Sequence, residues 1–298
     1  MPDKLVIEVR LNEYMSRRHT PHVPWTIDEI VQDALACHEA GAAVIHFHAR
    51  TEQGRPDLGY EANAEIVRRI RERCDVLIHP TLGAAAHGGG AAERLAVVER
   101  MIAAGLPVDL VPLDFATTNV DSFDATSGAF RTRDRVYTNT VETLTYFAGR
   151  LRELGVRAYP VAWNLVALRY LLAFHQAGLM DGPKFVQLMV SAPPHIFAHP
   201  DTLQGLRAYT DFLPETFAWN VYNMGGSIFP LLDHIIDAGG NVAAGLGDHP
   251  YVEEGRPTNA ELVRRIAERA RARGRQIASP AEARVRYGIG SAAPAPAH

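Results

Sequence analysis

Eight short runs rich in Val, Ile and Leu recur along this chain, and a helical pattern follows each of them. The apolar runs lie at residues 5–11, 43–48, 76–79, 108–113, 156–162, 185–189, 215–220 and 241–246. The helical patterns lie at 27–40, 62–73, 91–104, 140–154, 167–177, 202–212, 228–238 and 259–273. Strands that are apolar throughout are typical of parallel sheets, because both faces are buried. Eight strand–helix units therefore predict an α/β fold, the (β/α)8 TIM barrel.

The alternative is an open, doubly wound sheet, which often carries a glycine-rich phosphate loop after its first strand. Here the first strand runs into LNEYMSRRHTPHVPWT, which contains no glycine. Helix signals support the barrel count, since Thr26 with Glu29 and Thr258 with Glu261 have the spacing of a capping box. No Pro/Ser/Gly-rich linker interrupts the alternation, so residues 1–298 are expected to form one barrel domain with a short C-terminal tail at 288–298.

Charge and cysteine usage narrow the class of protein. Against 34 Asp and Glu there are 30 Lys and Arg, a formal net charge of −4 with no basic block, which disfavours a nucleic-acid partner. No apolar run approaches the ~18–20 residues that a membrane span needs. Cys37 and Cys74 are isolated, which favours a reducing compartment. We therefore expect a cytoplasmic protein with neither nucleic acid nor membrane as a partner.

Chemistry in such a barrel lies at the carboxyl ends of the strands. The second run ends in His46 and His48, which are two residues apart and so point to the same side of a strand. Two neutral imidazoles are good ligands for Zn²⁺ or another divalent ion, although a pair of hydrogen-bonded structural histidines is the alternative. His79 ends the third run and is a ligand, an acid–base group or a structural histidine. The eighth run leads to Asp248 and His249, a candidate base and a candidate third ligand; an ordinary turn is the alternative.

Other polar side chains follow the same rim. Arg10 and Asn12 end the first run, and Arg10 is able to bind a carboxylate bidentately. Thr81 after the third run offers a hydroxyl to a substrate oxygen. Thr117 after the fourth run and Asn220 in the seventh are further candidates for substrate orientation, although each of them fits a capping or turn role.

Two stretches carry a family resemblance: AGAAVIHFHAR at 40–50, with its HxHxR core, and PHVPWTIDE at 21–29. With them the chain resembles the β-keto acid cleavage enzymes, typified by 3-keto-5-aminohexanoate cleavage enzyme, over nearly its whole length. The resemblance implies a barrel with a catalytic divalent metal, usually zinc. It also implies condensation of a β-keto acid with acetyl-CoA, giving a new CoA thioester and a β-keto product, in a homo-oligomer that is a tetramer.

The resemblance also assigns residues. His46 and His48 match the two metal-binding histidines of the family. Thr81 falls at a substrate-binding Ser, and Thr117 at a substrate-binding Thr. Asp248 matches an Asp that helps to generate the attacking carbanion or enolate.

Several positions depart from the family pattern. The third metal ligand of the family, a Glu, is Gly247 here, and an Arg four residues before it is Ala243. The Asn-Gly pair after the first strand is Asn12-Glu13. We therefore expect His249 to replace the lost ligand, with His79 as the alternative.

The chain is accordingly predicted to be a metal-dependent enzyme that cleaves a carbon–carbon bond, an acyltransferase or lyase acting on a β-keto acid with acetyl-CoA. A metal-dependent hydrolase on the same barrel, with metal-bound water as the nucleophile, is one alternative. A non-catalytic, ligand-binding relative is the other.

Overall fold

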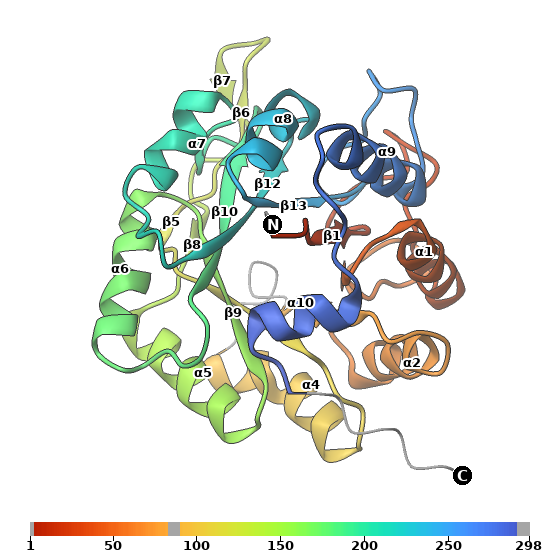
Figure 1. The fold of residues 1–298 in the computed structure, drawn as a ribbon. Coiled ribbons are helices and arrows are strands. Elements are labelled where there is room, and N and C mark those ends of the chain that lie inside the picture. The colour runs from red at the N-terminus through yellow and green to blue at the C-terminus, as the bar shows by residue number, and fades with distance from the viewer. Residues whose placement is uncertain (1–2, 83–89, 291–298) are drawn as a thin grey trace.

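Eight parallel strands form a barrel at the centre of the molecule (Figure 1) in the computed structural model, which describes residues 3–82 and 90–290. These strands are β1 (Ile7–Arg10), β2 (Val44–Phe47), β3 (Leu77–Pro80), β4 (Leu110–Asp114), β9 (Arg157–Ala162), β10 (Phe185–Ser191), β12 (Ala218–Met224) and β13 (Asn241–Ala244). They pair in the order β3-β2-β1-β13-β12-β10-β9-β4. The amide of Asp109, next to β4, donates to the carbonyl of Ile78 in β3 at 3.0 Å, which brings the two ends of the sheet together. The predicted (β/α)8 barrel is confirmed.

A ring of helices covers the outside of the barrel (Figure 1). One helix follows each barrel strand: α1 (Ile27–Ala40), α2 (Tyr60–Arg71), α4 (Ala91–Ala103), α5 (Val141–Glu153), α6 (Leu165–Gln176), α7 (Leu203–Thr210), α8 (Phe229–Asp237) and α9 (Asn259–Ala272). Both expected capping boxes are present, at the starts of α1 and α9. None of the helices within the described ranges is long and apolar enough to cross a membrane.

The sequence did not indicate the segment between β4 and α5. It contains two small antiparallel pairs, β5 (Thr118–Asn119) with β8 (Val136–Tyr137) and β6 (Phe123–Asp124) with β7 (Ala129–Phe130). A further short strand, β11 (His199–Pro200), pairs with the end of β10. These pieces stand at the carboxyl ends of β4 and β10 and build one wall of the mouth of the barrel.

A last helix, α10 (Pro280–Tyr287), lies across the opposite end of the barrel, where the strands begin (Figure 1). The ring of Tyr287 packs against Phe185, with centroids 4.7 Å apart, and against Tyr159 at 5.8 Å. Gly288, where the tail was expected to begin, caps this helix with a left-handed φ of 65°, and residues 291–298 lie outside the described residues. The carboxyl ends of the strands are therefore the end left for a site.

A buried carboxylate occupies the barrel interior. Glu8 accepts hydrogen bonds from the hydroxyl of Tyr159 at 2.6 Å and from the amides of Gln187 and Asn220 at 2.9 and 3.1 Å. The Nδ1 atom of His79 lies 3.0 Å from the same carboxylate. Burial alone raises the pKa of Glu8, but the hydrogen bond and charge of His79 outweigh it and hold the pKa below its usual value. Glu8 therefore has a structural role, as the acceptor at the centre of this network.

Asn259, the first residue of α9, ties the closing strands to the helical layer. Its Nδ2 donates to the carbonyl of Leu11 at 3.0 Å and to the carboxylate of Asp33 at 2.6 Å, and its Oδ1 accepts from the amide of Leu246 at 2.7 Å. Burial raises the pKa of Asp33 to about 6, against the lowering effect of the hydrogen bonds from Asn259 and Cys37. The folded protein therefore binds a proton at Asp33 more tightly than the unfolded chain does.

This raised pKa makes a pH-dependent prediction. Between the ordinary carboxyl range near pH 4 and the folded value near pH 6, the folded state holds more protons, so the contribution of Asp33 to stability falls as the pH rises and is constant above that window. Asp33→Asn removes this dependence and still accepts from Asn259. In urea unfolding at a series of pH values, the free energy of unfolding of the variant should rise relative to that of the wild type from pH 4 to pH 6. Glu39→Gln, exposed on the same helix, is the control, and an equal difference at every pH for Asp33→Asn contradicts the prediction.

Candidate metal centre and active site

A carboxylate, two imidazoles and a guanidinium meet at the mouth of the barrel. Glu13 follows β1, and its Oε1 lies 2.8 Å from Nε2 of His46 while its Oε2 lies 2.6 Å from Nε2 of His48. The Nη2 atom of Arg10 lies 2.5 Å from Oε1. All four side chains are buried. Burial alone raises the pKa of Glu13, but the charge of Arg10 and the interactions with His48 and His46 outweigh it, so the pKa is well below its usual value and the group is ionised.

The ring of His46 is oriented for ligation. Its Nδ1 lies 2.8 Å from the carbonyl oxygen of His79, and since a carbonyl only accepts, Nδ1 carries the proton. Burial, with the charges of Arg10 and His79, lowers the pKa of His46 to about 4 against the opposing effect of Glu13, so the ring is neutral at pH 7. Its Nε2 then presents a lone pair toward Glu13. Nε2 of His46 and Oε1 of Glu13 are then two hydrogen-bond acceptors only 2.8 Å apart, and a bound cation would stabilise this arrangement.

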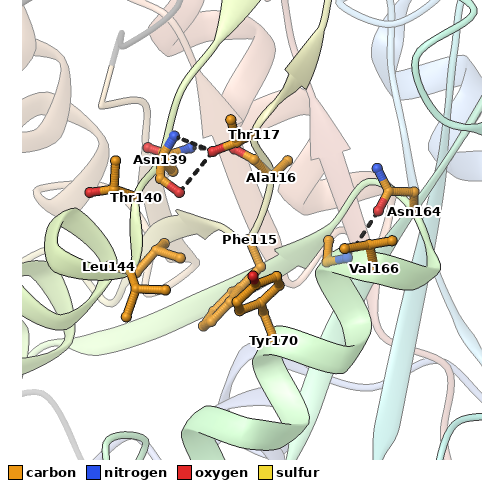
Figure 2. Close-up of a pocket in the computed structure, with 11 residues that line it drawn as sticks. Phe115, Ala116, Thr117, Asn139, Thr140, Leu144, Asn164, Val166 and Tyr170 are labelled. Atoms are coloured by element: carbon orange, nitrogen blue, oxygen red, sulfur yellow. Dashed lines mark hydrogen bonds between the residues drawn. The ribbon is translucent and has the colours of Figure 1, made fainter.

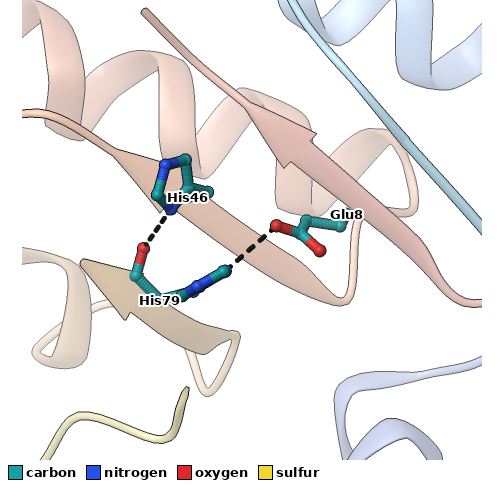
Figure 3. A group of neighbouring side chains, drawn as sticks. All are labelled: Glu8, His46 and His79. Atoms are coloured by element: carbon teal, nitrogen blue, oxygen red, sulfur yellow. Dashed lines mark hydrogen bonds and ion pairs between the residues drawn. The ribbon is translucent and has the colours of Figure 1, made fainter. Parts of the chain in front are cut away.

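A second group of possible ligands lies just below the first. Glu8, His46 and His79 have ligand atoms within 4.8 Å of one another, as do Glu13, His46 and His48 (Figure 3). Figure 3 shows the Nδ1 of His79 directed at Glu8 and the ring of His46 above the backbone of His79. The donors to Glu8 already satisfy the lower group. The upper group, in which the Oε1 of Glu13 accepts no hydrogen bond of ordinary geometry, fits a divalent ion better.

Asp248 stands beside this group and is held by Arg10. The Nε of Arg10 donates to Oδ1 of Asp248 at 2.8 Å, and the guanidinium lies over the ring of Tyr222, 4.1 Å from its centroid. Burial, with the negative charge of Glu13, raises the pKa of Asp248 to about 7 against the opposing effect of Arg10. A carboxylate in this range can both take up and release a proton near neutral pH.

A cavity of about 240 Å³ opens beside these residues. Arg10, Glu13, His46, His48 and Thr81 line one side of it. Its other side is mostly aromatic and apolar. The charged groups therefore face a small enclosed space, as a reaction centre requires.

The comparisons with known proteins agree with this geometry. The model of the beta-keto acid cleavage enzyme family matches residues 4–289. The chain belongs to this family. It is 29% identical over 294 residues to the 3-keto-5-aminohexanoate cleavage enzyme of Fusobacterium nucleatum, covering 95% of this chain and 97% of that one. It is 30% identical to the 3-dehydrocarnitine:acetyl-CoA trimethylamine transferase of Rhizobium meliloti, covering 88% and 89% of the two chains.

Among solved structures, the fold is similar to that of ObcA in its apo form. The TM-score is 0.71 at 16% identity, and the match covers 91% of this chain and 66% of the ObcA chain. At this identity the likeness shows the barrel fold alone. It agrees with the barrel described above and gives no information on the substrate.

The site of this beta-keto acid cleavage enzyme contains an exchange between positions 13 and 247. The resemblance predicts glycine at 13 and a metal-binding Glu at 247, and the chain has Glu13 and Gly247. A Cβ added to Gly247 would lie 2.6 Å from Cγ of Glu13 and 2.8 Å from its backbone nitrogen. The two positions, far apart in the sequence, thus share one space, and the carboxylate enters it from β1 instead of β13.

The backbone of Glu13 supports this interpretation. Its φ is 36°, in the left-handed region that glycine adopts freely and other residues adopt at a cost of about 1–2 kcal/mol. The backbone at position 13 thus keeps the conformation suited to the glycine that the family pattern predicts there, although the residue is a glutamate. From the sequence, the changes at 13 and 247 are two separate departures from the family pattern. Only the distance between the two positions in the structure shows that they are related.

The expected third ligands lie elsewhere. His249 places its Nδ1 3.1 Å from the carbonyl oxygen of Gly225 and its Nε2 2.7 Å from the carboxylate of Glu253. Among the described residues, it is in neither group of possible metal ligands. His79 is directed at Glu8, below the upper group. The structure therefore brings Glu13, and not His249, to His46 and His48.

Thr117 and its surroundings form a separate pocket between α5 and α6 (Figure 2). The Thr117 hydroxyl donates to the carbonyl of Asn139 and accepts from its amide, both at 3.0 Å, as Figure 2 shows. This pocket, of about 380 Å³, does not include the charged residues of the mouth. Thr117 and Thr81, which were expected to share a site, line different pockets.

The two expected asparagines have bonds within the framework. Asn12 donates to the carbonyls of Pro24 and His48 and accepts from the amide of His48 at 2.9 Å, which fixes the backbone at the second of the two histidines. Asn220 lies in the middle of β12, because this strand begins and ends later than predicted. Its amide points to Glu8 and Tyr159, away from the residues that line the cavity.

The shared space at 13 and 247 makes a stability prediction. Gly247→Glu should lower the free energy of unfolding by about 1–3 kcal/mol, because the new side chain meets Glu13. In the Glu13→Gly background the same change should cost less, by at least about 1 kcal/mol, since the side-chain conflict is gone. A double-mutant cycle by denaturant unfolding measures this coupling. Gly149→Glu on α5, where the space is open, is the control, and additive effects at 13 and 247 contradict the exchange.

Proposed function

We propose that this protein condenses a β-keto acid with acetyl-CoA and cleaves it, giving a CoA thioester and a new β-keto product. The observation that carries the proposal is the Glu13–His46–His48 group beside the Arg10–Asp248 pair, at one cavity of a family barrel. Two relatives support it through their names, one a β-keto acid cleavage enzyme and the other an acetyl-CoA-dependent transferase.

Glu13, His46 and His48 are the residues that would hold a divalent metal. One carboxylate and two imidazoles suit zinc, which commonly takes three protein ligands at catalytic sites. When bound, such an ion supplies a Lewis acid that polarises a keto oxygen. The carbonyl of His79 fixes the ring of His46, and Asn12 fixes the backbone of His48, so the chain presents its ligands already oriented.

Asp248 is the candidate base. Its carboxylate is held at one oxygen by Arg10, while its Oδ2 is buried without a hydrogen-bond partner among the described residues. With a pKa raised to about 7, it can remove a proton from a carbon acid more effectively than an ordinary carboxylate. In this proposal Asp248 moves the proton, and the Thr81 hydroxyl, which lines the cavity with Glu13, orients a substrate oxygen.

Arg10 has a positioning role in this scheme. Its charge is shared between Glu13 and Asp248, so it is less available to an incoming carboxylate than the sequence alone suggested. It holds the base at a fixed distance from the metal group. The proposal also retains the expected cytoplasmic location and homotetramer, and light scattering on the purified chain tests the latter.

The metal ligands can be tested directly. Glu13→Gln keeps the shape of the side chain and removes its charge, so we expect the affinity for Zn²⁺ to fall at least about tenfold. His249→Gln should bind metal as the wild type does, because His249 contacts Gly225 and Glu253 instead. Metal content after dialysis against buffered zinc, by mass spectrometry, distinguishes the two. If His249→Gln loses the ion and Glu13→Gln keeps it, the third ligand is His249, as the sequence led us to expect.

The reaction can be tested with a panel of β-keto acids, with and without acetyl-CoA, by following CoA thioesters by mass spectrometry. We expect turnover only with acetyl-CoA. Asp248→Asn should lower kcat by roughly 100- to 10,000-fold while leaving metal content unchanged. Product formed without acetyl-CoA indicates the hydrolase instead, and tight binding without turnover indicates a non-catalytic relative.

A further inference from the structure

One wall of the mouth cavity carries a second carboxylate that the proposed reaction does not use. Asp114 is the last residue of β4, and its Oδ2 accepts a hydrogen bond from the hydroxyl of Tyr137 at 2.6 Å. Its Oδ1 accepts from the indole Nε1 of Trp163 at 3.0 Å. Both oxygens are therefore held in place by donors on β8 and on the segment after β9. All three residues line the cavity that contains the metal-binding group.

These two donors orient the carboxylate but do not offset its charge. The other carboxylates near the cavity have basic side chains as partners: Glu13 and Asp248 both pair with Arg10, and Glu8 contacts His79. Within residues 3–82 and 90–290, Asp114 forms no ion pair. Burial, and then the charge of Asp114, raises the pKa of Tyr137 well above its usual value, so the phenol stays a neutral donor.

The other groups on the cavity wall do not supply the missing charge. Arg10 is the one Lys or Arg among the described residues of the lining, and two carboxylates already share it. His195 also lines the cavity, and burial lowers its pKa, so its ring is uncharged near neutral pH. A ligand that fills this side of the cavity therefore meets one uncompensated negative charge.

The surroundings of Asp114 are aromatic. The rings of Tyr137 and Trp163 are stacked, with centroids 4.7 Å apart and planes 1° apart, and the ring of Phe197 lies 5.3 Å from Trp163. Met189 and Met224 add to the same lining. Such a wall accepts methyl or methylene groups by apolar contact, and aromatic rings also attract organic cations. A fixed carboxylate set in aromatic side chains is suited to an ammonium group.

We propose that the substituent of the β-keto acid is an organic cation, a primary or alkylated ammonium, which binds at Asp114 against the wall formed by Tyr137, Trp163 and Phe197. This inference rests on the proposed function, since it assigns the second end of the same substrate. The keto end lies at Glu13, His46 and His48, and the cationic end lies at Asp114. A substrate with a second carboxylate would meet the charge of Asp114 without a cation to balance it.

The test compares β-keto acids that differ only at the far end: a trimethylammonium group, its neutral isostere tert-butyl, and a carboxylate. With metal-loaded wild type and acetyl-CoA, we expect kcat/KM to be about 10- to 100-fold higher for the cation than for the isostere, and lowest for the dicarboxylate. Asp114→Asn should reduce the preference for the cation to within about threefold while preserving turnover of the isostere. The Asn side chain still accepts from Trp163 and can donate to the hydroxyl of Tyr137, so the wall stays intact.

Asp134→Asn, which removes the same charge from an exposed position in the same segment, is the control and should keep the preference. A wild-type preference for the isostere or the dicarboxylate overturns the inference, as does an unchanged preference in Asp114→Asn.

A binding measurement separates this inference from the proposed function. Butanoate with a terminal trimethylammonium group, and its tert-butyl isostere, have no keto group and cannot react. We expect calorimetry to show tighter binding of the cation to the wild type and no such difference for Asp114→Asn. If no β-keto acid is turned over but this selectivity is found, the proposed function fails and the cation site stands. If turnover occurs without selectivity in either assay, the cation site fails and the proposed function stands.

Discussion

The buried carboxylate of Glu8 is the interaction on which the rest of this structure depends. It takes hydrogen bonds from side chains on four other strands of the barrel, namely His79, Tyr159, Gln187 and Asn220. A charge in a protein interior is tolerated only when such donors surround it, and each donor must then keep one orientation. Directly below the site, polar contacts to Glu8 therefore hold the side chains of the barrel interior in place. In the rest of the core, apolar packing has this role.

This order is transmitted to the mouth through contacts among three neighbouring strands, β1, β3 and β2. Glu8 fixes the ring of His79, the backbone of His79 fixes Nδ1 of His46, and the Nε2 of His46 faces Glu13. Arg10 then connects Glu13 to Asp248 on the far side. The proposed metal group and the proposed base are therefore parts of one continuous polar network.

The fold was predictable because the barrel strands are mostly apolar and regularly alternate with helical patterns, some of which begin with a capping box. The bounds of α1 agree with the sequence pattern, but the pattern placed the seventh strand at 215–220, and it runs at Ala218–Met224. Because of that shift, the pattern predicted Asn220 at the rim of the barrel, whereas the residue lies in the core. The pairs β5–β8 and β6–β7 were missed, because strands of two residues leave no periodicity to detect.

His46 and His48 could be grouped from the sequence because they lie two residues apart at one strand end, and the structure places them side by side. Glu13 could not be added to them, since its proposed role depends on a neighbour more than 200 residues away in sequence. The contact between Glu13 and Gly247 also constrains how such a protein arises from an ancestor of the usual family pattern. Glutamates at both positions would collide, so a lineage that changes one residue at a time must first lose the carboxylate at 247 and only then gain the one at 13. Such a path passes through a form with a carboxylate at neither position, in which the space that Glu13 now fills would be empty.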